Sequence, residues 1–107
     1  MGAVASGMRY RDRPDLALIV ADGGEGAVAG GVFTRNRFCA APVELCRERL
    51  GKGPIRCVVV NAGIANACTG AEGMRRARGM TRCVARHLGC DEEAVLVAST
   101  GVIGLQI

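Results

Sequence analysis

Residues 55–98 constrain the fold most strongly, because they alternate between strand-like and helix-like patterns. The apolar run "IRCVVVN" (Ile55–Asn61) predicts a buried strand, and "AVLVA" (Ala94–Ala98) predicts another. Between them, small and apolar residues recur at three- and four-residue steps and predict the packing face of a helix: Met74, Ala77, Thr81, Val84 and Leu88, widened by Met80 and Cys83. Two strands joined by one helix favour a right-handed crossover between parallel neighbours.

Both ends of this helix carry recognisable signals. Thr69 and Glu72 have the Thr-x-x-Glu spacing of a capping box, in which each side chain bonds a free backbone N–H of the first turn. Gly89 stands where a left-handed glycine commonly ends a helix. We therefore expect the helix to lie between Thr69 and Gly89.

The first half of the chain predicts shorter elements. "DLALIVA" (Asp15–Ala21) and "AVAGGVFT" (Ala27–Thr34) each predict a strand, and the turn "DGGEG" between them favours an antiparallel hairpin. Pro42 suits the first turn of a short helix that ends before Gly51. The fold class predicted from these elements is mixed α/β, a strand hairpin plus a strand–helix–strand crossover.

The composition limits where and with what this chain can work. Its 107 residues have room for one compact unit, and only three are aromatic, so the core must be built from aliphatic side chains, Met and Cys. No apolar run is long enough to span a bilayer, and the N-terminus lacks the pattern of a secretory signal. We expect a soluble, cytoplasmic protein with no membrane partner.

The cysteines and charges point to no metal and no nucleic acid. No two of the six cysteines have the Cys-x-x-Cys spacing of a zinc or redox motif, so reduced, packed thiols are expected. The single histidine, His87, has no neighbouring ligand in the sequence. The net charge is +4, but the arginines are dispersed and only Tyr10 is interleaved with them, which favours solvated surfaces over nucleic-acid binding.

Two segments of small polar residues follow the strands of the crossover. They are "NAGIANACTG" (residues 61–70) and "STGVIG" (residues 99–104). If the strands are parallel neighbours, both segments open at one edge of the sheet, where α/β folds place ligands. The alternative interpretation is that Gly and Asn only form turns there.

Ser99 and Thr100 lack the partners that a nucleophile requires. A catalytic hydroxyl needs a base, and the only histidine lies at the end of a helix; "STG" is also not a Gly-x-Ser-x-Gly elbow. A hydroxyl followed by a glycine N–H can instead donate two hydrogen bonds to a developing negative oxygen. This pattern favours an oxyanion hole whose nucleophile lies elsewhere.

Four blocks together resemble the ornithine acetyltransferase family: "DLALIVAD", "AGGVFTRNRFCAAPV", "VVVNAGIANACTG" and "VLVASTGVIG". The resemblance extends from about Met8 to Gly104. It implies part of the layered sandwich of these autoprocessing enzymes, with residues 1–107 as a single partial domain, the N-terminal segment of an α chain. Thr100 and Gly101 match the oxyanion pair of the family.

The resemblance also implies an activity and partners. The family moves an acetyl group from N2-acetylornithine to glutamate in arginine biosynthesis, through an acetyl-threonine on a β chain that autocatalytic cleavage releases. No cofactor is expected, although some members accept acetyl-CoA as donor. The β chain of the same precursor is the expected partner, in an α2β2 heterotetramer. The family's cleavage motif is absent here, so the isolated chain is expected to be inactive.

Two positions depart from the family pattern. The loop that usually reads Asn-Ser-Gly-Asn-Ala-Asn is "NAGIAN" here, so Ala62 and Ile64 replace polar residues while Asn61 and Asn66 remain.

The alternative hypothesis for the function is not an enzyme. It is a non-catalytic α/β binding or assembly module that requires a partner chain.

Overall fold

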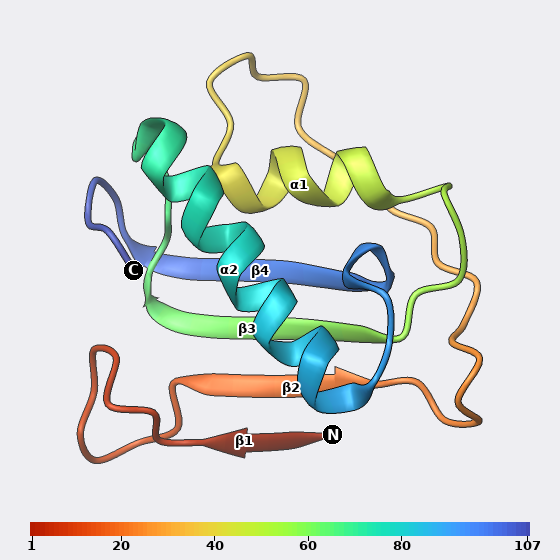
Figure 1. The fold of residues 1–107 in the computed structure, drawn as a ribbon. Coiled ribbons are helices and arrows are strands. Elements are labelled where there is room, and N and C mark those ends of the chain that lie inside the picture. Colours follow the sequence, from red (N-terminus) through yellow and green to blue (C-terminus); the bar gives the residue numbers. More distant parts are fainter.

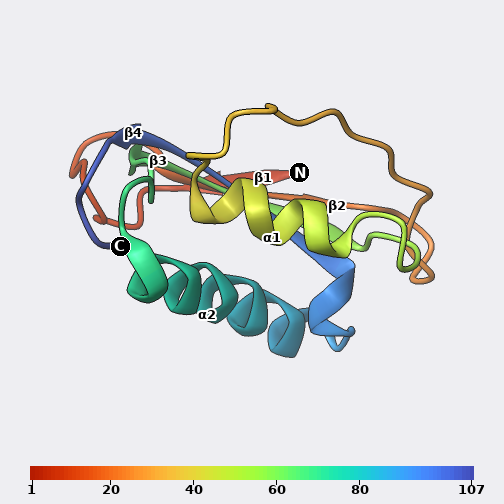
Figure 2. The ribbon, with the colours of Figure 1, turned by 90° about the horizontal axis from the view of Figure 1, so that it is seen from above.

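A computed structural model describes all of residues 1–107 and shows two helices packed on one face of a four-stranded sheet (Figures 1 and 2). The strands are β1 (Gly2–Val4), β2 (Leu16–Val20), β3 (Cys57–Ile64) and β4 (Val95–Val102), and they lie in this order across the sheet. The helices are α1 (Ala41–Arg49) and α2 (Gly70–Leu88), and a 3₁₀ turn, η1 (Glu92–Ala94), precedes β4. The mixed α/β class is confirmed.

The predicted crossover is also confirmed. β3 and β4 pair in parallel, with Cys57 opposite Val95 and Ile64 opposite Val102, and α2 connects them. β3 pairs with β2 in antiparallel register, and β1 adds an antiparallel edge strand to β2. The opposite face of the sheet carries no helix (Figure 2).

The core lies between the sheet and the two helices. Val59 and Val97 point from neighbouring strands into it, and Leu45 of α1 is fully buried. The core cluster contains small aliphatic side chains and two thiols: Ala41, Leu45, Cys46, Cys57, Val59, Ala77, Ala85, Val95 and Val97. Because the chain has only three aromatic residues, the helices pack largely through small residues such as Ala77, which is 0% exposed.

The predicted hairpin is wrong. Residues 27–34 form no strand, and only a single bridge joins Ala27 to Ile55. β1 and β3 already occupy both edges of β2, so no edge is left for a second hairpin strand. Val28 and Val32 are almost fully exposed, so this apolar run has no face to bury. β1 was not predicted, because a strand of three residues is too short to show an alternation of apolar and polar side chains.

The helix signals are confirmed in part. Gly89 ends α2 in the left-handed conformation with φ of 65°, as predicted. The capping box does not form: the Thr69 hydroxyl donates to Asn66 Oδ1, and Glu72 accepts from Arg75 and Arg76. The competing partners are stronger, because two guanidinium groups offer charge-assisted hydrogen bonds to Glu72.

The other predictions about the helices are also confirmed in part. Cys83 is exposed rather than part of the packing face of α2, whereas Met80 packs against the core. Pro42 lies in the first turn of α1, which ends before Gly51 as predicted. Neither helix combines the length and apolar character that crossing a bilayer requires.

Candidate functional site

The two predicted segments lie side by side at one edge of the sheet. Asn61 pairs with Ser99, Ala62 with Thr100, and Gly63 with Gly101, so the carboxyl ends of β3 and β4 coincide. The segments begin inside the strands rather than as turns, because the ladder continues to Ile64 and Val102. This end of the parallel pair is where α/β folds present ligand-binding groups.

Gly63 and Gly101 cross at this edge with their backbones in close contact. Both have positive φ angles, 103° and 132° respectively. A Cβ atom on Gly101 would lie 2.2 Å from the carbonyl carbon of Gly63, closer than any real contact. The pair therefore requires glycine on conformational and on steric grounds.

Thr100 points away from the helices. Side chains alternate along a strand, and the buried Val95 and Val97 face the helix layer, so Thr100 lies on the uncovered face. Thr100 is exposed, and no hydrogen bond within the chain engages its hydroxyl. The hydroxyl is free to donate to a group that approaches this face.

The Gly101 N–H points toward the open edge of β4. On the side of β4 that faces away from β3, the Val95 carbonyl accepts from Arg49, and the backbone groups of Val97 bond to Cys46, both of α1. The Val102 carbonyl instead accepts from Ala65, on the side of β3. Because successive residues alternate, the Gly101 N–H lies on the outer side, at the corner where this edge meets the uncovered face. Thr100 and Gly101 thus offer two donors at one corner.

The asparagines of the first segment hold the backbone of this edge. Asn61 is fully buried, and its Nδ2 donates to the Ile64 carbonyl at 2.9 Å. Asn66, also fully buried with φ of 51°, donates to the Gly73 carbonyl at 2.9 Å. Ile64 is 7% exposed, so the family's polar residue is replaced here by a packed apolar one. These residues support the site and do not reach its exposed corner.

Asp15 organises a neighbouring loop that the sequence did not single out. Its carboxylate, 2% exposed, accepts hydrogen bonds from the Ser6 N–H and hydroxyl at 2.6 and 2.7 Å. It also accepts from the N–H groups of Arg9 and Tyr10. The Ser6 hydroxyl, with the help of these N–H groups, holds the pKa of Asp15 well below its usual range. The only signal in the sequence was an acidic residue directly before an apolar strand.

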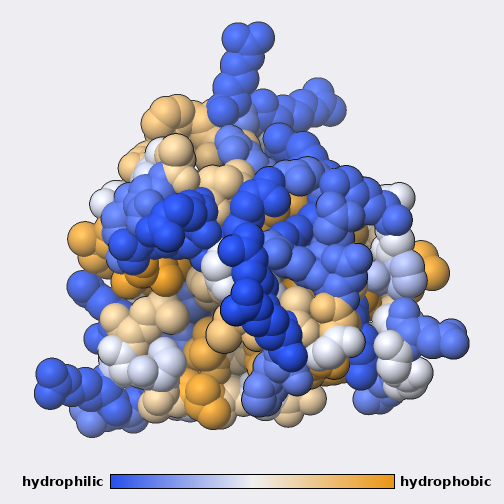
Figure 3. Space-filling model, in the orientation of Figure 1, coloured by the Kyte–Doolittle hydropathy of each residue, from blue (hydrophilic) through white to orange (hydrophobic).

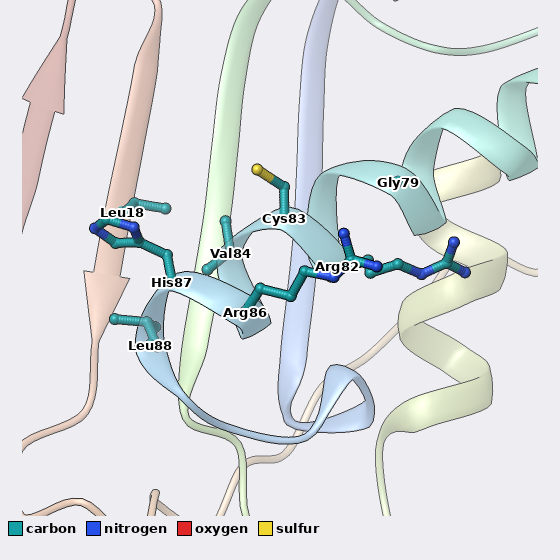
Figure 4. Close-up of a pocket in the computed structure, with 8 residues that line it drawn as sticks. All are labelled: Leu18, Gly79, Arg82, Cys83, Val84, Arg86, His87 and Leu88. Atoms are coloured by element: carbon teal, nitrogen blue, oxygen red, sulfur yellow. The ribbon is translucent and has the colours of Figure 1, made fainter.

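A separate pocket lies on the helix side of the sheet. It has a volume of about 520 Å³ and is lined by the second half of α2 and by Leu18 of β2 (Figure 4). His87 points toward Leu18 of β2, whereas Arg82 and Arg86, which also line the pocket, extend to the opposite side of α2 (Figure 4). No group of three or more His, Cys, Asp or Glu side chains is arranged to hold a metal ion. The pocket contains neither Thr100 nor Gly101.

Comparisons with known proteins find relatives that match nearly the whole chain. The sequence pattern of the ArgJ family matches residues 1–107. The arginine biosynthesis bifunctional protein ArgJ of Nitratidesulfovibrio vulgaris is 53% identical over 105 residues, which cover 97% of this chain and 26% of that protein. The relative from Thermosynechococcus vestitus is 49% identical over 105 residues, covering 97% of this chain and 25% of its own length.

Solved structures give the same result. The ornithine acetyltransferase of Mycobacterium tuberculosis, solved in complex with ornithine, superposes with a TM-score of 0.91 at 39% identity. The match covers 98% of this chain and 56% of that one. The ArgJ protein of Bacillus halodurans superposes with a TM-score of 0.84 at 38% identity, covering 92% and 51% of the two chains.

The fold and the sequence together define a member of an enzyme family with a mixed α/β architecture. The chain belongs to the ArgJ family. It spans about a quarter of the length of the curated relatives it matches.

Proposed function

We propose that this chain is the N-terminal α-chain segment of an acyltransferase of arginine biosynthesis. The proposed reaction moves an acetyl group from N2-acetylornithine to the amino group of glutamate. The names of the relatives and the ornithine complex of the Mycobacterium tuberculosis enzyme support this substrate class. In the proposed division of labour, this chain supplies the oxyanion hole and a β chain supplies the nucleophile.

The chemistry assigned to Thr100 and Gly101 follows from acyl transfer. A threonine hydroxyl on the β chain attacks the acetyl carbonyl carbon, and the carbonyl oxygen gains negative charge. The Thr100 hydroxyl and the Gly101 N–H donate to this oxygen and stabilise it more than the neutral carbonyl. The ornithine amine then leaves, and the amine of glutamate accepts the acetyl group in a second step of the same kind.

The remaining parts of the proposal concern partners and location. The β chain arises by autocatalytic cleavage of a common precursor and assembles with this chain as an α2β2 heterotetramer in the cytoplasm. Acetyl-CoA is a second acetyl donor to test beside N2-acetylornithine. The isolated 107-residue chain should show no acetyl transfer, because it lacks the nucleophile.

One observation carries the proposal: Thr100 and Gly101 place two donors at an exposed corner of the parallel pair. The test is Thr100→Ala in the complete enzyme, with its melting temperature checked. Loss of one oxyanion donor should lower kcat about 10²–10³-fold and leave KM nearly unchanged. Thr100→Ser keeps the hydroxyl and should retain much of the activity. A near-normal rate for Thr100→Ala would remove Thr100 from the site and favour a non-catalytic binding module.

A further inference from the structure

The loop between β1 and β2 carries three positive charges without ionic partners. Arg9, Arg11 and Arg13 lie in this segment, residues 5–15, which we call the arginine loop. None of the ion pairs in the structure involves these three arginines, whereas most arginines of α2 are paired with glutamates. The five consecutive residues 9–13 line a shallow pocket of about 510 Å³. The loop forms a hydrophilic projection at the lower left of Figure 3.

The buried carboxylate of Asp15 fixes the path of this loop. It binds the backbone of Ser6, Arg9 and Tyr10, so the loop folds around one acceptor. The Arg13 guanidinium lies over the Tyr10 ring, 3.7 Å from its centre. A loop held in this way loses little conformational entropy when its side chains bind a ligand.

The arginine loop lies at the same edge as Thr100 and Gly101. β2 runs antiparallel to β3, so the start of β2 meets the carboxyl end of β3, and the Asp15 carbonyl accepts from the Ala62 N–H at 2.8 Å. Figure 1 shows the loop beside the ends of β3 and β4. The side-chain stem of Arg9 rests on Gly63, because a Cβ atom there would lie 2.3 Å from Arg9 Cβ. Gly63 in turn contacts Gly101.

We propose that the arginine loop binds an anionic oxygen group of a substrate while that substrate's acetyl group occupies the corner of Thr100 and Gly101. This inference rests on the proposed acyltransferase function and identifies the substrate class as anionic. Arg9 is the principal contact, since its stem is seated on Gly63, one strand away from Gly101. Arg11 and Arg13 add positive charge, which Asp12 of the same pocket offsets only in part, and this excess attracts the anion to this edge.

Two sources could supply the anion. Guanidinium groups bind planar carboxylates and tetrahedral phosphates through the same charge-assisted hydrogen bonds. The α-carboxylate of the amino-acid substrates is one source, and the phosphates of acetyl-CoA are the other. Comparison of acetyl-CoA with acetylpantetheine, which lacks the nucleotide phosphates, separates the two.

The test measures KM and kcat of the complete enzyme for each substrate after Arg9→Gln. Glutamine keeps Cβ and Cγ, so the contact with Gly63 is preserved while the charge is removed. Loss of one charge-assisted contact should raise KM about 10- to 100-fold for the substrate whose carboxylate or phosphate the loop binds, with kcat nearly unchanged. Arg9→Lys should restore part of the affinity. The matched control is Arg86→Gln, an exposed and unpaired arginine near the far end of α2, which should leave KM unchanged.

Equilibrium binding separates this inference from the proposed function. Glutamate, ornithine and coenzyme A, none of which carries an acetyl group to transfer, are titrated calorimetrically into the complete protein and into its Arg9→Gln variant. Weaker binding to the variant supports the arginine loop even if no acetyl transfer is found. Unchanged affinity for all three compounds, together with unchanged KM, overturns the inference while leaving Thr100 untouched.

Discussion

The backbones of Gly63 and Gly101 pack directly against each other at the candidate site. They are paired residues of parallel strands, and each has a positive φ angle. A Cβ atom on Gly101 would meet the carbonyl carbon, carbonyl oxygen and Cα of Gly63 at 2.2, 2.5 and 2.6 Å. Backbone atoms cannot move aside as a flexible side chain can. The position of the Gly101 N–H therefore depends on the absence of a side chain at both residues.

Gly101→Ala should destabilise the protein and displace the second donor. The strained φ angle and the overlap with Gly63 together should lower the free energy of unfolding by at least ~2 kcal/mol. Gly79→Ala is the matched control, because Gly79 lies in α2 with open space around its Cβ position. Alanine there should raise stability by up to about 1 kcal/mol. Urea unfolding measures the free energy of unfolding of both variants. Equal effects of the two substitutions would contradict the close contact between Gly63 and Gly101.

Arg49 should be the most important charged residue for stability. Its side chain is 2% exposed, and it donates to the Val95 carbonyl at 2.6 Å and to Glu92 at 2.9 Å. Arg49→Ala leaves a buried carbonyl and a carboxylate without this donor, so we expect a loss of about 3–5 kcal/mol. The exposed Lys52, paired with Glu93 at 3.2 Å, provides the comparison. Lys52→Ala should cost below about 1 kcal/mol in the same denaturation experiment.

The pKa of Asp15 makes the arginine loop sensitive to acid. The Ser6 hydroxyl and three backbone N–H groups favour the charged carboxylate, so its folded pKa lies below that of an unfolded chain, about 3.9. Its contribution to stability is therefore complete above that value and is lost as the pH falls toward the folded pKa. Melting temperature should drop as the pH is lowered below about 4, and Asp15→Asn should flatten this dependence. Asp22→Asn, at an exposed residue, should leave the curve unchanged.

The sequence predicted the crossover because long apolar periodicity determines it. The strands around Val59 and Val97 and the stripe through Ala77 and Thr81 each contain enough residues for a pattern to rise above chance. The predicted strand at residues 27–34 was wrong for a tertiary reason. β1 and β3 pair with both edges of β2, and the local sequence of residues 27–34 does not reveal this competition. Capping by Thr69 failed because its backbone is helical, with φ of −111° and ψ of 0°, whereas an N-cap residue is extended, and its hydroxyl is turned toward Asn66.

The candidate site, too, could be predicted from the sequence only in part. Thr100 and Gly101 could be singled out because a hydroxyl beside a glycine suggests a known chemical device. Their approach to Gly63 could not be predicted, because it depends on the register of two strands separated by α2. Asp15 was missed as the centre of the arginine loop, since its partners are backbone N–H groups that leave no trace in residue type.

Asn61 and Ser99 face each other beneath the site and should differ in their response to truncation. They are paired residues of β3 and β4, and no protein group bonds to Asn61 Oδ1 or to Ser99 Oγ. Asn61→Ala removes the donor to the Ile64 carbonyl and leaves a cavity, so it should cost about 2 kcal/mol or more.

Ser99→Ala removes a buried hydroxyl without leaving any protein partner unpaired. We therefore expect its free energy of unfolding to change by less than about 0.5 kcal/mol, or to rise slightly. In the complete enzyme, Ser99→Ala should keep near-normal kcat, because Thr100 alone carries the hydroxyl of the exposed corner. Urea unfolding and steady-state kinetics on the two single variants and the double variant provide the measurement. A loss of activity in Ser99→Ala as large as that in Thr100→Ala would show that the wrong hydroxyl has been assigned to the oxyanion hole.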